Sequence, residues 1–127
     1  MFDGPELDDA ARLVDEWQAG IDARAAQARE LSARLARLST TLRSPDGLVT
    51  VTLGSSGDLV DLTLAEGIRS RPAAETARAI LATVREARLR LTAAVTEVTA
   101  ETVGADSATG QAVIASYAMR AGRASDE

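Results

Sequence analysis

The chain has 127 residues, a length that fits one domain, and 46% of them are hydrophobic although only 2% are aromatic. It contains no cysteine and no histidine, which excludes disulfides, thiolate metal sites and the usual catalytic triads, so we expect no enzyme, no cofactor and no metal. The net charge is −5, and all 14 basic residues are arginines.

The first predicted element is a long helix from about Leu7 to Leu38. Its seam residues recur alternately every four and three positions, the heptad spacing of a helix that packs along another helix: Ala10, Val14, Trp17, Ile21, Arg24, Ala28, Leu31, Leu35 and Leu38. We expect Asp8 or Asp9 to cap its start, and the guanidinium of Arg24 to reach water. A rod on the order of 45 Å long cannot bury itself in a compact fold, which predicts an elongated protein completed by a partner chain.

A β-hairpin is predicted next. Residues 48–53 form a β-branched run, residues 54–57 (Gly-Ser-Ser-Gly) supply a turn, and residues 58–64 alternate apolar and polar side chains. The segment 39–44 is ambiguous, because Thr40 and Thr41 favour a strand while Leu42 continues the helical spacing. Two or three strands with open edges are marginal alone, so we expect a homodimer through the sheet. The predicted interface consists of Leu48, Val49, Val51, Leu53, Leu59, Val60, Leu62 and Leu64.

A second long helix is predicted from Pro72 to a stop at Gly104, with a seam of the same spacing from Ala73 to Val98. Because the two seams have similar lengths, the simplest arrangement is an antiparallel helical hairpin. Residues 105–127 are interpreted as a tail, short helical or disordered, that follows a domain of residues 1–104. Asp106 or Ser107 would cap the tail helix, and its apolar patch of Val113, Ile114 and Tyr117 either folds onto the hairpin or docks a protein partner.

The strands resemble those of a known family. Residues 47–53 (GLVTVTL), followed by residues 57–64 (GDLVDLTL), are similar to the YbaB/EbfC family of bacterial nucleoid-associated proteins, and the similarity covers roughly Leu7 to Thr102. The resemblance implies an α+β protomer of long helix, antiparallel sheet and long helix, with Thr40–Ser44 as a first strand. It also implies a homodimer with a shared sheet and tweezer-like projecting helices, and non-catalytic DNA binding with little sequence preference.

The resemblance implies basic groups towards the projecting helix ends, and the charge pattern of this sequence departs from that expectation. Residues 1–22 hold seven acids and one arginine, and residues 96–127 hold five acids and two arginines. Arginines collect instead in residues 23–43 and 67–95, two blocks that we expect to converge near the sheet. The predicted DNA-binding residues are Arg29, Arg34, Arg37, Arg43, Arg69, Arg71, Arg78, Arg85 and Arg88.

Two functions fit these features. The first is a cytoplasmic, nucleoid-associated homodimer whose arginines contact the phosphates of duplex DNA, since the chain lacks the aromatic platforms that single strands need. The alternative is an acidic scaffold of the same fold that acts as a protein-interaction module in a secretion or stress system. We expect no membrane partner, because no apolar run reaches the roughly 18 residues of a membrane span.

Overall fold

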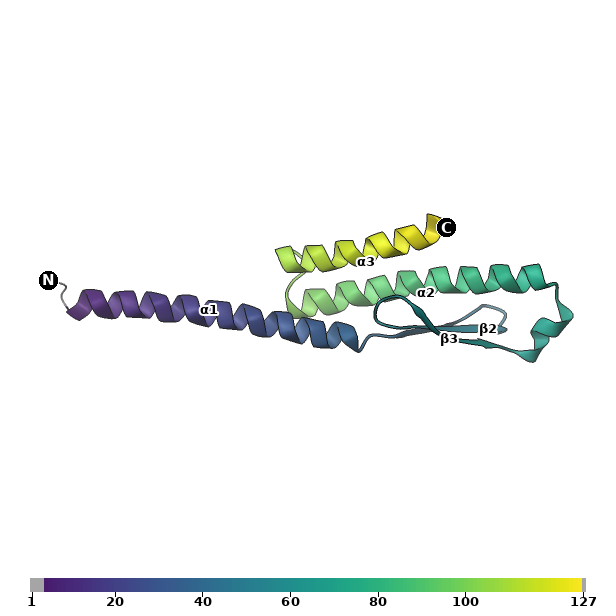
Figure 1. Cartoon of the computed structure of the whole chain (residues 1–127), viewed down its shortest axis with the longest axis horizontal. Helices are drawn as coiled ribbons and strands as arrows, with labels where there is room; N and C mark the ends of the chain where they lie inside the picture. Colours follow the sequence, from purple (N-terminus) through teal and green to yellow (C-terminus); the bar gives the residue numbers. More distant parts are fainter. Residues whose placement is uncertain (1–3, 127) are drawn as a thin grey trace.

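A computed structural model describes the backbone of residues 4–126 and the side chains of residues 7–121. The elements are the long helix α1 (Gly4–Ala36), the strands β1 (Thr40–Arg43), β2 (Val49–Leu53) and β3 (Leu59–Leu64), the short 3-10 helix η1 (Glu66–Ser70), and the helices α2 (Ala73–Thr102) and α3 (Ala108–Asp126). This order confirms the predicted α+β fold. Figure 1 shows an elongated molecule in which α1 extends away from a body formed by the sheet, α2 and α3.

The three strands form one antiparallel sheet in the order β1-β2-β3, and α2 covers one of its faces. The central strand directs Val49, Val51 and Leu53 under α2, where all three are fully buried and pack with Val84 and Ala87. This burial corrects part of the predicted dimer interface. The side chains of Val49, Val51 and Leu53 already fill the protomer's own core, so they are not available to a second copy.

The edge strand β3 is exposed along its whole length, because α2 lies over β1 and β2. Its register places Leu62 opposite Val51 and Leu64 opposite Val49, so these two leucines lie on the α2 side of the sheet. A β-bulge then puts both Leu59 and Val60 against Leu53, which breaks the strict alternation expected from the sequence. The result is an apolar, uncovered strand at one edge of the sheet.

The turn between β1 and β2 is fixed by a polar network around Asp46. The Asp46 carboxylate accepts hydrogen bonds from the Ser44 hydroxyl at 2.7 Å, from the Leu48 backbone N–H at 3.0 Å and from Arg71 at 2.9 Å. Ser44 in turn accepts a hydrogen bond from the Val49 backbone N–H at 3.0 Å. These bonds to the ionised carboxylate, led by the one from Ser44, lower the pKa of Asp46 from 3.8 to about 2.

The lowered pKa predicts a pH-dependent contribution to stability. Because the folded pKa lies below the unfolded value of 3.8, the stabilisation from Asp46 is present above that value and is lost as the pH falls towards 2. We expect the melting temperature of the wild type to exceed that of Asp46→Asn at neutral pH, and the gap to narrow in acid. Thermal unfolding of both proteins across the pH series measures this gap, and a gap that is constant with pH would contradict the assignment.

The two long helices lie nearly end to end rather than side by side, which corrects the predicted helical hairpin. β1 continues in the direction of α1, so α2 returns over the sheet and meets only the last turns of α1 (Figure 1). There Arg34 donates hydrogen bonds to Glu101 and Thr102, each at 2.8 Å. Leu31 is the buried residue of α1 within residues 7–36, and residues 7–30 are almost entirely exposed. Only α1 therefore projects from the body.

The helix ends also refine the predictions. α1 begins at Gly4, so Asp8 and Asp9 lie inside the helix and do not cap it. The predicted stop at Gly104 is confirmed, because this glycine has a φ of 87°, which is the left-handed conformation typical of a helix C-terminus. Ser107 accepts a hydrogen bond from the Gly110 backbone N–H at 2.9 Å, which confirms it as the cap of α3.

The tail forms a helix that packs on the body. α3 runs antiparallel to the C-terminal half of α2, and the predicted patch of Val113, Ile114 and Tyr117 is half-buried (Figure 1). The Tyr117 hydroxyl donates a 2.7 Å hydrogen bond to the Ser55 carbonyl in the β2–β3 turn. Of the two fates predicted for this patch, the structure shows the first, folding onto the body.

Removing the Tyr117 hydroxyl is expected to destabilise the β2–β3 turn. Tyr117→Phe keeps the ring but leaves the Ser55 carbonyl without its donor, which typically costs about 0.5–1.5 kcal/mol. We expect a small loss in the free energy of unfolding, together with faster amide exchange at Gly57, whose N–H donates to Gly54 within the turn. Ser116→Ala on the same helix is the control, and we expect it to exchange like the wild type. If Gly57 exchanges at the same rate in the wild type, Tyr117→Phe and Ser116→Ala, the Tyr117 hydroxyl does not stabilise the turn.

Candidate nucleic-acid interface

Three of the predicted arginines share one face of α2. Arg78, Arg85 and Arg88 are seven and three residues apart, a spacing that places them on one side of a helix. At 1.5 Å per residue they span about 15 Å of the helix axis. One strand of duplex DNA carries a phosphate about every 3.4 Å, so this row can face several successive phosphates.

The arginines differ in how far their charge is already neutralised. Within the described residues, Arg78 and Arg85 are exposed and have no hydrogen-bond acceptor or carboxylate partner. Arg88 is half-buried and donates to the Gly57 carbonyl at 3.4 Å, a neutral acceptor that leaves its charge in place. The face of α2 therefore presents three cationic groups that form no ion pair with any described acid.

Arg29 and Arg34 near the end of α1, and Arg37 just after it, lie at one end of the body. Arg34 is held by Glu101 in a 2.8 Å ion pair, while Arg29 and Arg37 are exposed and have no partner among the residues that the structure describes. About 20 Å of α2 separates Glu101 from Arg88, at 1.5 Å per residue. The arginines near the end of α1 therefore do not meet Arg88, and the two basic blocks come together at the β1–β2 turn, where Arg43 bonds Gly47 and Arg71 bonds Asp46.

A third group lies at the other end of the sheet. Arg71 forms a 2.9 Å ion pair with Asp46, and Arg69 forms a 2.7 Å ion pair with Glu66. Arg43 donates to the Gly47 carbonyl at 3.2 Å. Two of these three arginines are thus paired with acids, and Arg71 also holds the β1–β2 turn through Asp46.

The sequence analysis did not include Arg120, which the fold brings to the β2–β3 turn. Its guanidinium lies 4.8 Å from the centre of the Tyr117 ring, a cation–π contact, while Tyr117 bonds to Ser55 of that turn. Arg88 reaches the same turn at Gly57. The sequence spacing along α3 could not predict that Arg120 lies near this turn, because its position depends on how α3 packs on the body.

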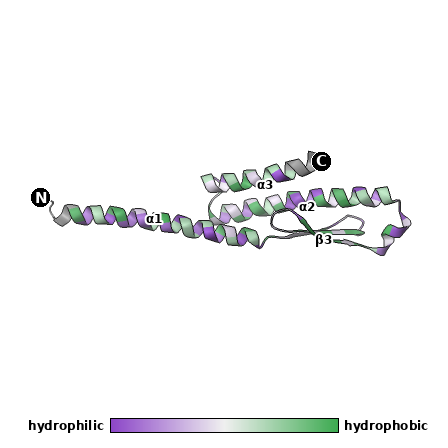
Figure 2. Cartoon of the chain, in the orientation of Figure 1, coloured by the Kyte–Doolittle hydropathy of each residue, from purple (hydrophilic) through white to green (hydrophobic). Residues whose placement is uncertain are grey.

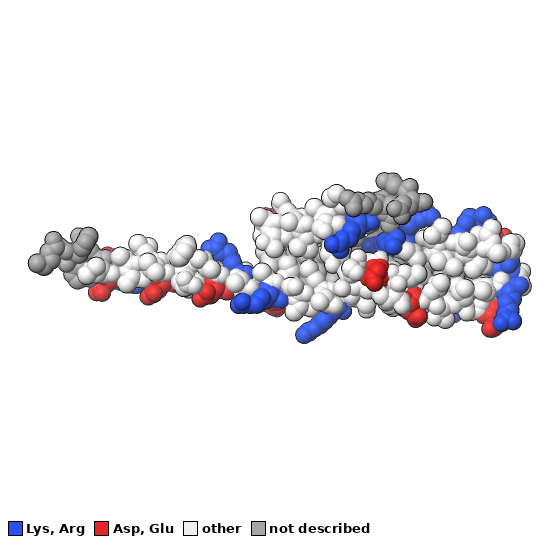
Figure 3. Space-filling model, viewed as in Figure 1, with Lys and Arg blue, Asp and Glu red and all other residues white. Residues whose placement is uncertain are grey.

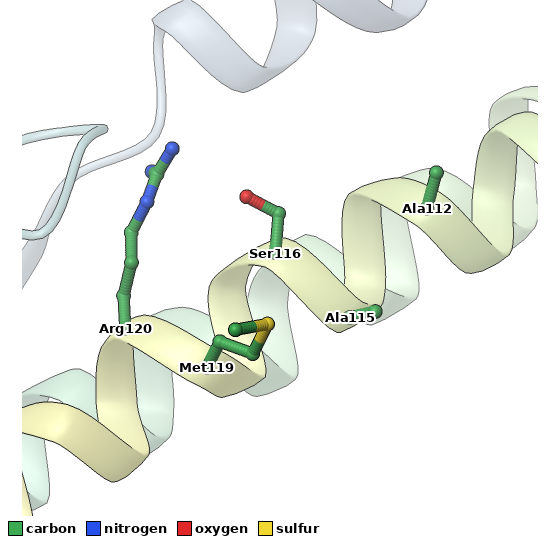
Figure 4. Close-up of a pocket in the computed structure, with 5 residues that line it drawn as sticks. All are labelled: Ala112, Ala115, Ser116, Met119 and Arg120. Atoms are coloured by element: carbon green, nitrogen blue, oxygen red, sulfur yellow. The ribbon is translucent and has the colours of Figure 1, made fainter.

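A shallow hollow of about 350 Å³ lies beside α3 and is lined by Ala112, Ala115, Ser116, Met119 and Arg120 (Figure 4). All five residues come from one helix, and three of them present only small side chains. Small-molecule sites usually gather several polar groups from different elements. We assign no ligand to this hollow.

Charge is segregated along the molecule. In Figure 3 acidic atoms mark the projecting part of α1, while arginine atoms appear from the later part of α1 onwards and over the body. The acids of the projecting part are Asp8, Asp9, Asp15, Glu16 and Asp22, and all are exposed. The end of α2, by contrast, is not a projecting tip, because it packs against α1 and α3. The acidic start of α1 is therefore a poor surface for phosphate, and the exposed arginines of the body are the better candidates.

Residues 14–106 match the family model of the YbaB/EbfC DNA-binding family. The chain belongs to this family. A search of curated proteins gives no match to the chain. The matched range contains the sheet, α2, the part of α1 from residue 14 onwards and all nine predicted arginines, whereas α3 of this YbaB/EbfC protein begins just after it.

The YbaB/EbfC assignment makes DNA the partner of this fold. None of the helices within residues 4–126 combines the length and apolar character that a membrane span requires. The arginine row of α2 is consequently the described surface with the clearest chemistry for a polyanion, because its charge is exposed and lies within the matched range.

Proposed function

We propose that this YbaB/EbfC protein binds duplex DNA as a homodimer, with little sequence preference, and acts as a nucleoid-associated protein. The observation that carries the proposal is the row of Arg78, Arg85 and Arg88 on α2, in a chain whose family is DNA-binding. Arginine contacts to phosphate release counterions and carry no sequence information, so they favour affinity without base readout.

The homodimer forms through β3. This strand offers free backbone groups and the exposed side chains of Leu59, Val60, Leu62 and Leu64, which are 37–57% exposed. Pairing two β3 strands around a two-fold axis would extend the sheet and cover these residues. The row on α2 would then occur twice in one particle, which doubles the number of phosphate contacts.

The remaining predicted arginines join this surface to different degrees. Arg29 and Arg37 carry uncompensated charge at the α1 end of the body and would lengthen the contact on a longer duplex. Arg34, Arg69 and Arg71 are engaged by acids, and Arg43 by a carbonyl, so they contribute less.

The test is a fluorescence-anisotropy titration of the full chain with two labelled duplexes of the same length and unrelated sequence, over a series of salt concentrations. We expect similar affinities for the two duplexes and a steep linear fall of log K with log salt. A large difference between the duplexes would overturn the lack of sequence preference. Absence of binding at low salt and ~100 µM protein, the weak end of non-specific affinities, would overturn DNA binding itself.

The alternative, a protein-interaction module that docks a partner through the tail, is less favoured by the structure. The patch of Val113, Ile114 and Tyr117 is engaged by the protein's own body, and Tyr117 bonds to Ser55. Docking a partner through this patch would compete with these contacts to the body.

A further inference from the structure

The last helix, α3, meets the arginine row of α2 at the β2–β3 turn. Arg88 of the row donates to the Gly57 carbonyl at 3.4 Å. The Tyr117 hydroxyl of α3 donates to the Ser55 carbonyl of the same turn at 2.7 Å. Figure 2 shows hydrophilic residues in the middle of α2 and towards the end of α3, where the two helices lie side by side. The end of α3 is therefore next to the α2 surface to which we assign DNA.

Arg120 brings a further cation to this junction. It follows Tyr117 by three residues, a spacing that places the two side chains next to each other on a helix. Its guanidinium lies 4.8 Å from the centre of the Tyr117 ring, which is itself anchored on the turn. Figure 4 shows the Arg120 side chain extended away from the axis of α3, and the residue is exposed. The guanidinium is therefore held beside the turn and remains open to solvent.

The charge of Arg120 is not spent on an ion pair. Among the residues whose side chains the structure describes, Arg120 contacts the face of a neutral ring and pairs with no carboxylate. The acid of the turn, Asp58, accepts a 2.6 Å hydrogen bond from the Ser56 hydroxyl and forms no ion pair with a described arginine. Arg88 has only a neutral carbonyl as its acceptor. Both guanidinium groups at this junction can therefore pair with phosphate.

The position of Arg120 relative to the row suits a double helix. The three arginines of α2 follow one line along the helix axis, whereas Arg120 comes from a second helix packed against it. The axes of packed helices lie about 8–10 Å apart, so Arg120 widens the cationic surface to one side of the row. Duplex DNA presents phosphates along two strands, and its affinity rises with the number of phosphates that arginines neutralise. A wider surface therefore contacts more phosphates than the row alone.

We propose that α3 extends the DNA-binding surface of α2, with Arg120 contacting a phosphate of the duplex that the α2 row binds. The inference rests on the proposed DNA binding and adds to it a helix outside residues 14–106, the range matched by the family model. Tyr117 is then a positioning residue, because its hydroxyl anchors the ring on Ser55 while the ring face holds the Arg120 guanidinium.

The test compares Arg120→Gln with the wild type in anisotropy titrations of the full chain against a labelled duplex, over a series of salt concentrations. We expect the affinity at low salt to fall about 10-fold, because one phosphate contact is lost. The slope of log K against log salt should fall by about 0.9 for each protomer that touches the duplex. The slope is the decisive readout, since it counts phosphate contacts and does not follow from a change in stability.

Two further variants serve as matched controls. Arg90→Gln makes the same change in charge, but Arg90 lies about 200° around α2 from Arg88 and so points away from the row. Arg90 is also paired with Glu86 at 3.6 Å, and we expect its variant to keep the affinity within about twofold and the salt slope of the wild type. Arg120→Lys keeps the positive charge and should retain the slope that Arg120→Gln loses.

The outcomes separate this inference from the proposed function. If the wild type binds the duplex and Arg120→Gln behaves like Arg90→Gln, α3 has no part in binding, and DNA binding by α2 still stands. If Arg120→Lys loses as much slope as Arg120→Gln, Arg120 acts through the packing of α3 and not through its charge, which also overturns the inference. A wild type that does not bind at low salt would overturn both the inference and the proposed function.

Discussion

Replacing Arg78 and Arg85 together by glutamine is expected to weaken duplex DNA binding by about 100-fold at low salt. Both side chains are exposed and have no acid partner among the described residues, so their full charge is available to phosphate. Each lost phosphate contact lowers the slope of log K against log salt by about 0.9, which gives a fall of about 2 for each protomer that touches the duplex.

The control for this variant has the same change in charge. Arg12 pairs with Asp9 at 3.0 Å and Arg90 pairs with Glu86 at 3.6 Å, so both are compensated within their own helices. Arg12→Gln with Arg90→Gln should leave the affinity within a few-fold of the wild type and the slope nearly unchanged. Anisotropy titrations of both double variants with the labelled duplex measure the two affinities. Equal losses of affinity would show that net charge, and not the arginine row of α2, governs binding.

Placing a lysine at Leu62 is expected to dissociate the homodimer. Leu62 lies on the α2 side of β3, is 39% exposed in the protomer and would be covered by the second copy. Burying an unpaired ammonium group there costs on the order of 3 kcal/mol, which raises the dissociation constant by about 100-fold. Sedimentation velocity over a concentration series measures the change, and circular dichroism checks that the protomer remains folded.

Thr63→Lys supplies the matched control on the neighbouring residue. Thr63 is paired with Thr50, on the face of the sheet that α2 does not cover, so its lysine can extend into water in the dimer. We expect this variant to dimerise like the wild type. A wild type that sediments as a monomer at all concentrations would refute the shared sheet, and a dimeric Leu62→Lys protein would move the interface away from β3.

The elements of the fold were predictable because each has a local chemical cause. The β-branched run before Gly54 and the left-handed turn at Gly57 mark the hairpin, and Gly104 ends α2 as expected. Helix-to-helix placement was not predictable in the same way. Heptad spacing shows that a helix has an apolar seam but not which surface covers it, so two seams of similar length wrongly indicated a helical hairpin.

The candidate site was predictable in composition but not in geometry. The spacing of Arg78, Arg85 and Arg88 fixes their common face once α2 is a helix. Which arginines are neutralised depends on tertiary contacts, such as Arg34 with Glu101 and Arg71 with Asp46, across 67 and 25 residues of sequence. The core could not be predicted for the same reason. The alternation of side chains along β2 shows that one face of the strand is buried, but the burial of Val51 depends on α2 covering that face.

The two edges of the sheet are chemically unequal, and this limits how far the protein can polymerise. β1 has four residues, of which two are threonines and one is Arg43, whereas β3 has six, of which four are apolar. A sheet with two adhesive edges would add copies without end and grow into fibres. In the proposed dimer both outer edges of the joined sheet would be β1 strands, which are short and polar, so strand addition would end at two copies.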